Sequence, residues 1–222
     1  MKTRIFSTLC LLVLFASAAV SQERYVRPVD EAKKDASFLA FRTRLIAAAE
    51  RKDAAYIFKI LDRNITSSFG GHDGIADFKE FWKINEKGSK FWGEFLRAIK
   101  NGGHFYQEGR VRTFTAPYSY SGFPEDLDSF EHSVIFGDKV NLRDAPRMDS
   151  KVIGSLSYNI VTIIGGEPEP GPETDADWYR IKTLGGKTGW MKAEYVRSPI
   201  DYRAGFQKKS GAWRMIFFVA GD

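Results

Sequence analysis

The chain has 222 residues and a formal net charge of +5, with 33 lysines and arginines against 28 aspartates and glutamates. This length permits one large domain or two small ones. The basic residues are spread along the chain without a block of like charge, a distribution that argues against a nucleic-acid-binding protein. Aromatic residues make up 14% of the chain, which is a large supply of side chains for burial.

The N-terminus has the pattern of a secretory signal peptide. Lys2 and Arg4 precede a short apolar run at 9–15, and four small residues follow at 16–19. The run is far shorter than the ~20 residues that a membrane helix needs. We therefore predict a signal peptide at 1–19 and an exported, periplasmic or extracellular protein with no transmembrane segment in the mature chain. The only cysteine lies in the predicted signal peptide, so neither disulfides nor thiol chemistry are expected after cleavage.

The first half of the mature chain is predicted to be mainly helical. Residues 20–36 carry a proline and many charges, and we expect a flexible lead-in there. Beyond them, apolar side chains recur at three- and four-residue steps, which predicts amphipathic helices. The four predicted helices lie at about 37–50, 53–61, 75–82 and 90–100. A stretch rich in glycine and serine between the second and third helices predicts a short strand and a turn.

The second half of the chain is predicted to be mainly β-structure. Alternating apolar residues predict strands at 110–115 and 130–136, and a β-hairpin at 202–219 near the C-terminus. A hairpin alone is marginally stable in water, so it must pack against another element. We expect it to join the sheet formed by residues 110–136, which would make the segment between them an insertion. The alternative is a small helical domain followed by a barrel with its own C-terminal extension.

The segment at 138–198 has the pattern of a small, closed β-barrel. Five short runs of β-branched and aromatic residues are separated by clusters of glycine, proline and aspartate. Its motifs are Asn-Leu-Arg-x-x-Pro at 141–146, Trp-Tyr-x-Ile at 178–181 and Gly-x-Thr-Gly-Trp-Met at 186–191. In this order, the segment resembles the bacterial SH3-like family of cell-envelope proteins. It departs from that family in a long loop at 165–177, which contains five acidic residues and three prolines.

Without the insertion, the predicted order is helix, helix, short strand, helix, helix and four strands. This order is similar to the cone-shaped α+β fold of nuclear-transport-factor-2-like proteins, although the helix at 90–100 departs from that pattern. The expected fold class is therefore α+β, with a curved sheet and helices in one domain and a small all-β barrel inserted before the C-terminal hairpin. The expected boundaries are 37–137 plus 199–222 for the α+β domain and 138–198 for the SH3-like barrel.

Aromatic residues of the barrel are the first candidates for a binding site. Alternation along the strand at 178–181 places Tyr179 and Ile181 inward and Trp178 outward. In barrels of the SH3-like family, an aromatic groove between loops binds extended peptides, and the resemblance assigns Trp178, Trp190 and Tyr195 to such a groove. The alternative is that these side chains pack on the barrel itself or against the first domain.

A second set of aromatic residues belongs to the first domain. If that domain is a cone, Phe69, Trp82, Trp92 and Tyr118 are candidates to line a pocket. At helical spacing, such residues are also typical of a hydrophobic core.

Catalytic and metal-binding motifs are not evident in the sequence. The histidines His72, His104 and His132 are not at metal-ligand spacing, and an ordinary surface or hydrogen-bonded role accounts for them. Phosphate-binding, dinucleotide-binding and nucleophile-elbow motifs are not found either. The acidic loop at 165–177 lacks the glycine and Asx spacing of a calcium loop, so we interpret it as a stiff, solvated loop. A negative rim that attracts a cationic ligand is the alternative. No metal or cofactor is predicted.

Together, these features predict an exported, non-enzymatic binding protein of the cell envelope. Its barrel would recognise a peptide, a peptidoglycan-type ligand of the cell wall, or an envelope protein. One alternative is a small-molecule-binding or catalytic pocket in the α+β domain, with the barrel as an accessory. Another is a purely structural protein that binds a partner.

Overall fold

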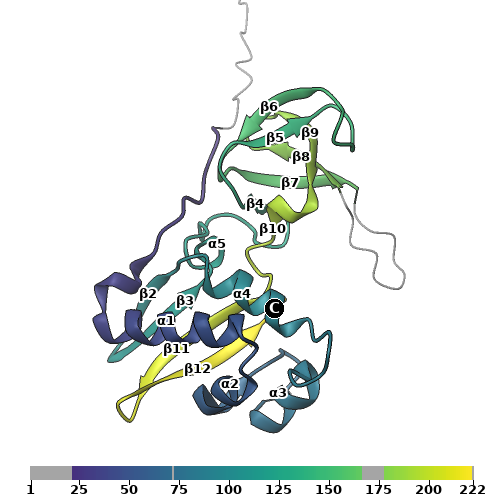
Figure 1. The fold of residues 1–222 in the computed structure, drawn as a ribbon. Coiled ribbons are helices and arrows are strands. Elements are labelled where there is room, and N and C mark those ends of the chain that lie inside the picture. The colour runs from purple at the N-terminus through teal and green to yellow at the C-terminus, as the bar shows by residue number, and fades with distance from the viewer. Residues whose placement is uncertain (1–21, 72, 167–177, 222) are drawn as a thin grey trace, which may run out of the picture.

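The computed structural model describes residues 22–71, 73–166 and 178–221. Two sheets lie one beyond the other, and α1 to α4 gather around the one that contains β11 and β12 (Figure 1). The chain is a mixed α+β protein, as predicted. The predicted signal peptide and the acidic side chains of the loop at 167–177 lie outside the described residues.

The four helices expected from the apolar periodicity are present. The helical elements are η1 (Glu31–Lys34), α1 (Ala36–Glu50), α2 (Ala54–Ile60), α3 (Ile75–Trp82), α4 (Phe91–Ile99), α5 (Tyr118–Ser121) and η2 (Ala193–Tyr195). Asp35 and Asp53 begin α1 and α2 by accepting hydrogen bonds from the backbone N–H groups of Phe38 and Tyr56. The short helix α5 was not expected, because its Tyr-Ser-Tyr-Ser sequence carries no helical periodicity.

The five-stranded sheet has the order β1-β12-β11-β3-β2. Its strands are β1 (Leu61–Thr66), β2 (His104–Glu108), β3 (Val111–Ala116), β11 (Arg203–Lys209) and β12 (Ala212–Val219). The hairpin β11–β12 turns at Ser210 and Gly211, which both have positive φ, as a two-residue hairpin turn requires. β11 pairs antiparallel with β3, and β12 pairs parallel with β1. The predicted insertion before a C-terminal hairpin is therefore confirmed.

The other sheet has seven strands in the order β10-β4-β7-β8-β9-β5-β6. Its strands are β4 (Ser133–Ile135), β5 (Val140–Arg143), β6 (Val152–Leu156), β7 (Ile160–Gly165), β8 (Trp178–Thr183), β9 (Thr188–Lys192) and β10 (Val196–Arg197). The expected closed barrel is not found, because β10 and β6 are the two edges of the sheet and are not paired with each other. β10 has only two residues, and both pair with β4.

The strand expected at 130–136 differs from the prediction in length and partner. It is reduced to β4, which pairs with β7 and β10 and not with the strands of the five-stranded sheet. All three of its residues are buried, so it has no solvent-facing side. Ile135 packs in the core of the seven-stranded sheet, and Val134 packs in a separate cluster with Val26, Tyr118 and Ile160. The alternation of apolar and polar residues at 130–136 therefore does not indicate which sheet this strand joins.

The lead-in also differs from the flexible segment that was expected at 20–36. From residue 22 onward it lies against the body of the protein, and the side chain of Val26 is only 2% exposed. Asp30 forms an ion pair with buried Arg42 of α1, with 2.6 Å between Oδ1 and Nη1. Arg24 makes two hydrogen bonds to the carboxylate of Asp126. Arg24 and Asp126 are 102 positions apart, so local composition does not reveal this contact.

The core of the α+β region is built largely from aromatic rings. Phe38 of α1 lies at its centre, with five other rings at centroid distances of 4.2–5.9 Å. These rings belong to Phe41, Phe105, Phe114, Phe206 and Trp213, and so come from α1 and four strands. Since β11 and β12 supply two of them, the C-terminal hairpin completes the core of the first half of the chain.

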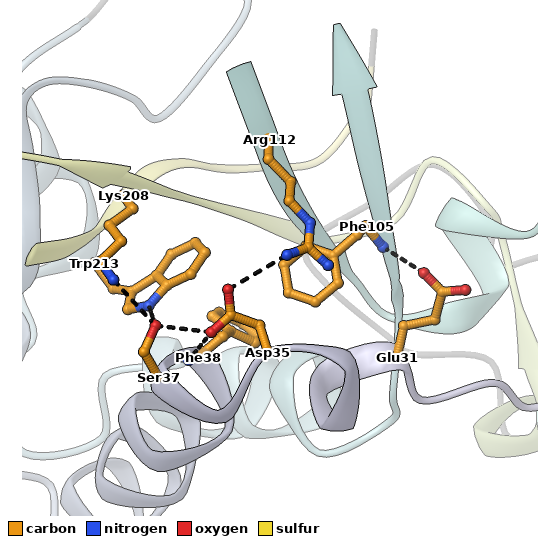
Figure 2. A network of polar contacts seen from close by, with 8 residues as sticks. All are labelled: Glu31, Asp35, Ser37, Phe38, Phe105, Arg112, Lys208 and Trp213. Carbon is orange, nitrogen blue, oxygen red and sulfur yellow. Dashed lines mark hydrogen bonds and ion pairs between the residues drawn. The ribbon is translucent and has the colours of Figure 1, made fainter. Parts of the chain in front are cut away.

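A polar network fixes the start of α1 on the sheet (Figure 2). The Asp35 carboxylate accepts hydrogen bonds from Ser37 Oγ at 2.7 Å and from the Phe38 N–H at 3.0 Å. Arg112 of β3 lies 3.3 Å from the same carboxylate and places its guanidinium over the ring of Phe105, 3.7 Å from the centroid. The hydrogen bond from Ser37 is the main cause that holds the pKa of Asp35 below its usual value.

The hydroxyl of Ser37 connects this network to the C-terminal hairpin. It accepts hydrogen bonds from Trp213 Nε1 at 3.0 Å and from Lys208 Nζ at 3.2 Å. On the other side, Glu31 accepts a hydrogen bond from the backbone N–H of Phe105 in β2 at 2.9 Å. The network therefore ties the helical start of the chain to both a central hairpin and an edge strand (Figure 2).

Candidate functional site

One face of the seven-stranded sheet carries a mixture of aromatic and basic side chains. In the β8–β9 pair, Trp178 lies opposite Lys192 and Arg180 lies opposite Trp190. Directly opposite residues point to the same side of a sheet, so these four side chains share one face. Tyr179 and Ile181 point to the other side, where both pack with the core. The inward and outward directions predicted for residues 178–181 are therefore confirmed.

A groove of about 270 Å³ lies at the end of this face, and we call it the aromatic groove. Its lining residues are Asp138, Lys139, Val140, Asn141, Arg143, Met148, Trp178, Lys192, Glu194 and Tyr195. Trp178 contributes from β8 and Tyr195 from η2, while Met148 lies in the loop after β5 and is 62% exposed. The structure thus brings together two of the three predicted residues, Trp178 and Tyr195.

The third predicted residue, Trp190, lies beside this groove without lining it. It is half-buried, and its ring packs close to Gly166. A Cβ atom at position 166 would lie 3.0 Å from Cζ3 of Trp190 and 2.4 Å from the carbonyl oxygen of Trp178. Gly166 also has a φ of +81°, a conformation that favours glycine. The Trp190 ring therefore packs against the backbone just after β7.

Tyr195 is held in place by backbone contacts and by a small residue. Its carbonyl oxygen accepts a hydrogen bond of 2.7 Å from the N–H of Phe136. A Cβ atom at Gly137 would lie 2.8 Å from Cγ2 of Val140 and 3.6 Å from Cδ1 of Tyr195. The absence of a side chain at Gly137 therefore leaves room for Val140 and for the Tyr195 ring.

The rim of the aromatic groove carries charges of both signs. Lys139, Arg143 and Lys192 supply positive charge, and Asp138 and Glu194 supply negative charge. The Arg143 Nη1 donates a hydrogen bond to the carbonyl of Ser150 at 2.6 Å, which fixes the guanidinium. Lys192 and Glu194 are 3.9 Å apart, and such an exposed ion pair contributes little stability. Aromatic faces with a mixed-charge rim suit the binding of an extended polar chain.

A larger hollow of about 630 Å³ lies where the two sheets meet, and we call it the junction cleft. The α+β region contributes Glu94 and Arg97 from α4, and the seven-stranded sheet contributes Ser133, Ile163, Tyr179 and Lys192. The seven-stranded sheet also contributes Val196 from β10, and the segments outside the strands contribute Ala193, Glu194, Ser198, Asp201 and Tyr202. No sequence pattern predicted this cleft, because its walls come from α4 and from segments up to about 100 residues further along the chain.

A buried arginine supports the junction cleft from behind. Arg197 of β10 is 1% exposed, and its Nη2 donates a hydrogen bond of 2.6 Å to the carbonyl of Tyr202. Its Nη1 lies 3.2 Å from Asp201, within ion-pair distance but without hydrogen-bond geometry. The guanidinium also lies over the ring of Phe136 at 5.5 Å. Burial lowers the pKa of Arg197, and the charge of Asp201 opposes this effect.

The four aromatic residues proposed for a pocket in the first domain are not gathered in one place. Trp82 and Trp92 are buried in the main core of the α+β region. Tyr118 packs in the separate cluster and stacks on Phe136 at 5.2 Å. Phe69 is 52% exposed and lies against the guanidinium of Arg203. A pocket formed by these four residues remains a prediction that the geometry does not support.

The described histidines make local hydrogen bonds. His104 Nδ1 lies 2.8 Å from Ser121 Oγ, and His132 Nδ1 lies 2.9 Å from the carbonyl oxygen of Asp128. His72 lies outside the described residues. Within the part of the chain that the structure describes, no group of three or more histidine, cysteine, aspartate or glutamate residues could hold a metal ion. Among the same residues, no helix is long and apolar enough to cross a membrane.

Comparisons with known proteins concern mainly the seven-stranded sheet. Residues 138–197 match the family model of the bacterial SH3 domain, which covers about a quarter of the chain. An NTF2-like protein with a cystatin-like fold from Novosphingobium aromaticivorans is similar at 12% identity, over 84% of this chain and 88% of that chain. The TM-score of that comparison is 0.27, which supports no conclusion about fold or function. No curated protein gives a significant match to the chain.

Proposed function

We propose that this protein is an exported, non-enzymatic binding protein of the cell envelope, whose SH3 domain binds an extended peptide in the aromatic groove. The observation that carries the proposal is that Trp178 and Tyr195 line one groove on a domain that matches the bacterial SH3 model. Bacterial SH3 domains commonly bind cell-wall components, so a wall-derived peptide is the proposed ligand. The basic start and apolar run at residues 2–15 support export.

The groove residues suit such a ligand for a physical reason. Aromatic rings bind extended peptides through large, rigid apolar surfaces, which lose little side-chain entropy on binding. Trp178 and Tyr195 come from a strand and from a short helical turn that are both held by backbone hydrogen bonds. The groove is therefore formed before a ligand arrives, which lowers the entropic cost of binding.

Calorimetric titration of the mature protein with wall-derived stem peptides tests the proposal. We expect saturable binding, and we expect Trp178→Ala to weaken it about tenfold or more, as for a central aromatic contact. Calorimetry is preferred to tryptophan fluorescence for this variant, because the substitution removes a reporter. Tyr106→Ala is the control, since Tyr106 is 59% exposed on β2 and lies outside the groove. Equal affinities of Trp178→Ala and the parent protein would contradict the proposed site.

Export is tested separately from binding. We expect the full-length chain to be recovered from the periplasm or the medium with an N-terminus between residues 19 and 22, as N-terminal sequencing would show. An intact Met1 in a cytoplasmic fraction would contradict export without affecting the groove.

A second candidate function is a small-molecule site in the α+β region, beside α3. A hollow of about 320 Å³ is lined there by Ser67, Ser68, Asp77, Glu80 and Phe81. The Ser67 side chain is 4% exposed, and its hydroxyl has no hydrogen-bond partner among the described residues. A small polar ligand in this hollow would satisfy that hydroxyl. An NMR screen of small polar molecules, with Ser67→Ala as the comparison, distinguishes this candidate from the SH3 groove.

A further inference from the structure

We infer that the peptide in the aromatic groove is anchored by its C-terminal carboxylate, which Arg143 binds while Arg180 adds positive charge beside it. This inference rests on the proposed function, because it names the chemical group by which the same groove recognises the same peptide. Aromatic contacts alone accept many apolar chains, whereas a charged anchor also decides which end of the chain enters the groove.

Two arginines flank one tryptophan on the seven-stranded sheet. Arg143 of β5 lies opposite Trp190 of β9, and Trp190 lies opposite Arg180 of β8. Directly opposite residues point to the same side of a sheet, so these side chains form one row across the face. The neighbouring row contains Trp178 and Lys192, which lie opposite each other and line the aromatic groove together with Arg143. The row of arginines is therefore continuous with the groove.

Arg143 is held in position before a ligand arrives. Its Nη1 donates a hydrogen bond of 2.6 Å to the carbonyl of Ser150, and its backbone lies in β5 between β6 and β9. Ser150 is itself fixed, because it is only 6% exposed and its hydroxyl donates to the carbonyls of Ala145 and Arg147, each at 2.8 Å. A fixed guanidinium loses less side-chain entropy when it binds a carboxylate.

Donors of both arginines remain available to a ligand. A guanidinium has five N–H donors, and the bond to Ser150 uses only one side of Arg143. Arg180 is exposed, and its side chain makes no hydrogen bond or ion pair within the residues that the structure describes. Within the same residues, no carboxylate is paired with Arg143. Neither positive charge is therefore neutralised by the described part of the chain.

The charges that line the groove also favour an anion. Lys192 and Glu194 lie 3.9 Å apart and offset each other. Asp138 accepts a hydrogen bond of 2.7 Å from a neighbouring serine hydroxyl, and it stands against both Lys139 and Arg143. The lining therefore has an excess of positive charge. The planar fork of an arginine matches the two oxygens of a carboxylate, so a carboxylate is the anion that suits Arg143 best.

The size of the groove suits the end of a peptide. At about 270 Å³, it lies below the usual range for sites that enclose a drug-sized ligand, so it holds a short segment. A carboxylate bound at Arg143 leaves the residue before it beside the rings of Trp178 and Tyr195, which line the same groove. One short segment can therefore use the charge and the aromatic rings together.

The test compares two forms of one peptide. A wall-derived stem peptide is prepared as its C-terminal acid and as its C-terminal amide, and each is titrated into the mature protein by calorimetry. We expect the amide to bind about tenfold more weakly, which corresponds to about 1.4 kcal/mol, because it loses the charge-assisted hydrogen bonds. The preference should become smaller at high salt, since the arginines are open to solvent.

Three variants locate the anchor. We expect Arg143→Gln to bind both forms with similar, weaker affinity. Arg180→Gln should reduce the preference to about threefold, because Arg180 adds charge beside the anchor. Arg110→Gln is the charge-matched control, since Arg110 is exposed in the turn between β2 and β3, and it should keep the tenfold preference. Urea unfolding checks that Arg143→Gln is folded. If it is not, Arg180→Gln decides, because that side chain has no contact to lose among the described residues.

The outcomes separate this inference from the proposed function. Equal binding of the acid and the amide by the parent protein, or an undiminished preference in Arg143→Gln or Arg180→Gln, would overturn the carboxylate anchor. If Trp178→Ala then still weakens both forms, the aromatic groove remains the peptide site without that anchor. If neither form binds the parent protein, both the proposed function and the anchor are wrong.

Discussion

The two regions of this protein use their aromatic residues in opposite ways. In the α+β region, phenylalanine and tryptophan form the core, with Phe38, Phe91 and Phe95 fully buried. In the SH3 domain, the core consists of aliphatic side chains and a methionine, and among the described aromatic residues only Tyr179 packs against it. Trp178 and Tyr195 are left on the surface, where they line a groove. In this protein, the aromatic residues that are binding candidates are therefore those that the neighbouring hydrophobic core does not include.

Truncation of a central core ring is expected to have the largest effect. Phe38→Ala removes a ring that contacts five others, and we expect a loss of about 3–5 kcal/mol in the free energy of unfolding. Phe130→Ala, at a side chain that is 68% exposed, should change this quantity by less than about 0.5 kcal/mol. Denaturant unfolding measures both. The comparison between the regions fails if Trp178→Ala destabilises the protein as much as Phe38→Ala.

A smaller effect is expected where the groove depends on the lack of a side chain. In Gly137→Ala, the new Cβ would lie 2.8 Å from Cγ2 of Val140 and would press on the setting of Tyr195. We expect a loss of about 1–3 kcal/mol in stability and weaker peptide binding, as for other overpacked sites. Gly93→Ala is the control, because a Cβ atom at position 93 would meet nothing within 4 Å and Gly93 does not have a positive φ. Unchanged binding by Gly137→Ala would show that the Tyr195 position does not depend on Gly137.

The smallest expected effect concerns pH and lies in the α+β region. The pKa of Asp35 is held below its usual value, mainly by the hydrogen bond from Ser37, and that of Glu31 mainly by the hydrogen bond from Lys34. A carboxylate whose pKa is lower in the folded state than in the unfolded state stabilises the folded protein at pH values above the unfolded-state pKa. This contribution is lost as the pH falls through the folded-state pKa.

We therefore expect stability to decline below about pH 4, where unfolded aspartates and glutamates take up protons. Asp35→Asn should cost up to about 1 kcal/mol at neutral pH, because the amide keeps the helix cap but loses the ion pair with Arg112, and it should flatten the decline at acid pH. Urea unfolding at pH 7 and at acid pH measures both quantities. A decline of the same steepness in Asp35→Asn would show that other carboxylates cause it.

The parts of the fold that depend on local sequence were predictable. Apolar periodicity placed α1 to α4 within a few residues, and alternation gave the outward direction of Trp178. The hairpin at 202–219 was predicted from a turn at 209–212, and its need for a partner sheet led to the insertion. The prediction placed β4 in the sheet of the C-terminal hairpin, whereas β4 pairs with β7 in the seven-stranded sheet. Its neighbours in sequence do not reveal which strand it pairs with.

The candidate site was only partly predictable. The resemblance to bacterial SH3 domains indicated Trp178 and Tyr195, because both lie near recognisable motifs. It did not indicate that Trp190 packs beside Gly166 outside the groove, or that α4 lines a second hollow. Arg197 would be taken for a surface residue from its sequence alone, because arginine is rarely buried without a partner. Its partners Asp201 and Tyr202 follow closely in sequence, but its burial depends on the meeting of the two regions.

The sequence by itself determined the helices, the SH3 motif and the side of β8 that carries Trp178. These properties depend on residues within one turn or one strand, where periodicity and spacing act directly on backbone geometry. Only the tertiary structure decided where the hairpin and β4 pair, which aromatic side chains remain exposed, and that a cleft joins α4 to the SH3 groove. These depend on contacts between residues that are distant in sequence, such as Val134 with Ile160 and Leu61 with Met215, and packing of the whole chain selects those contacts.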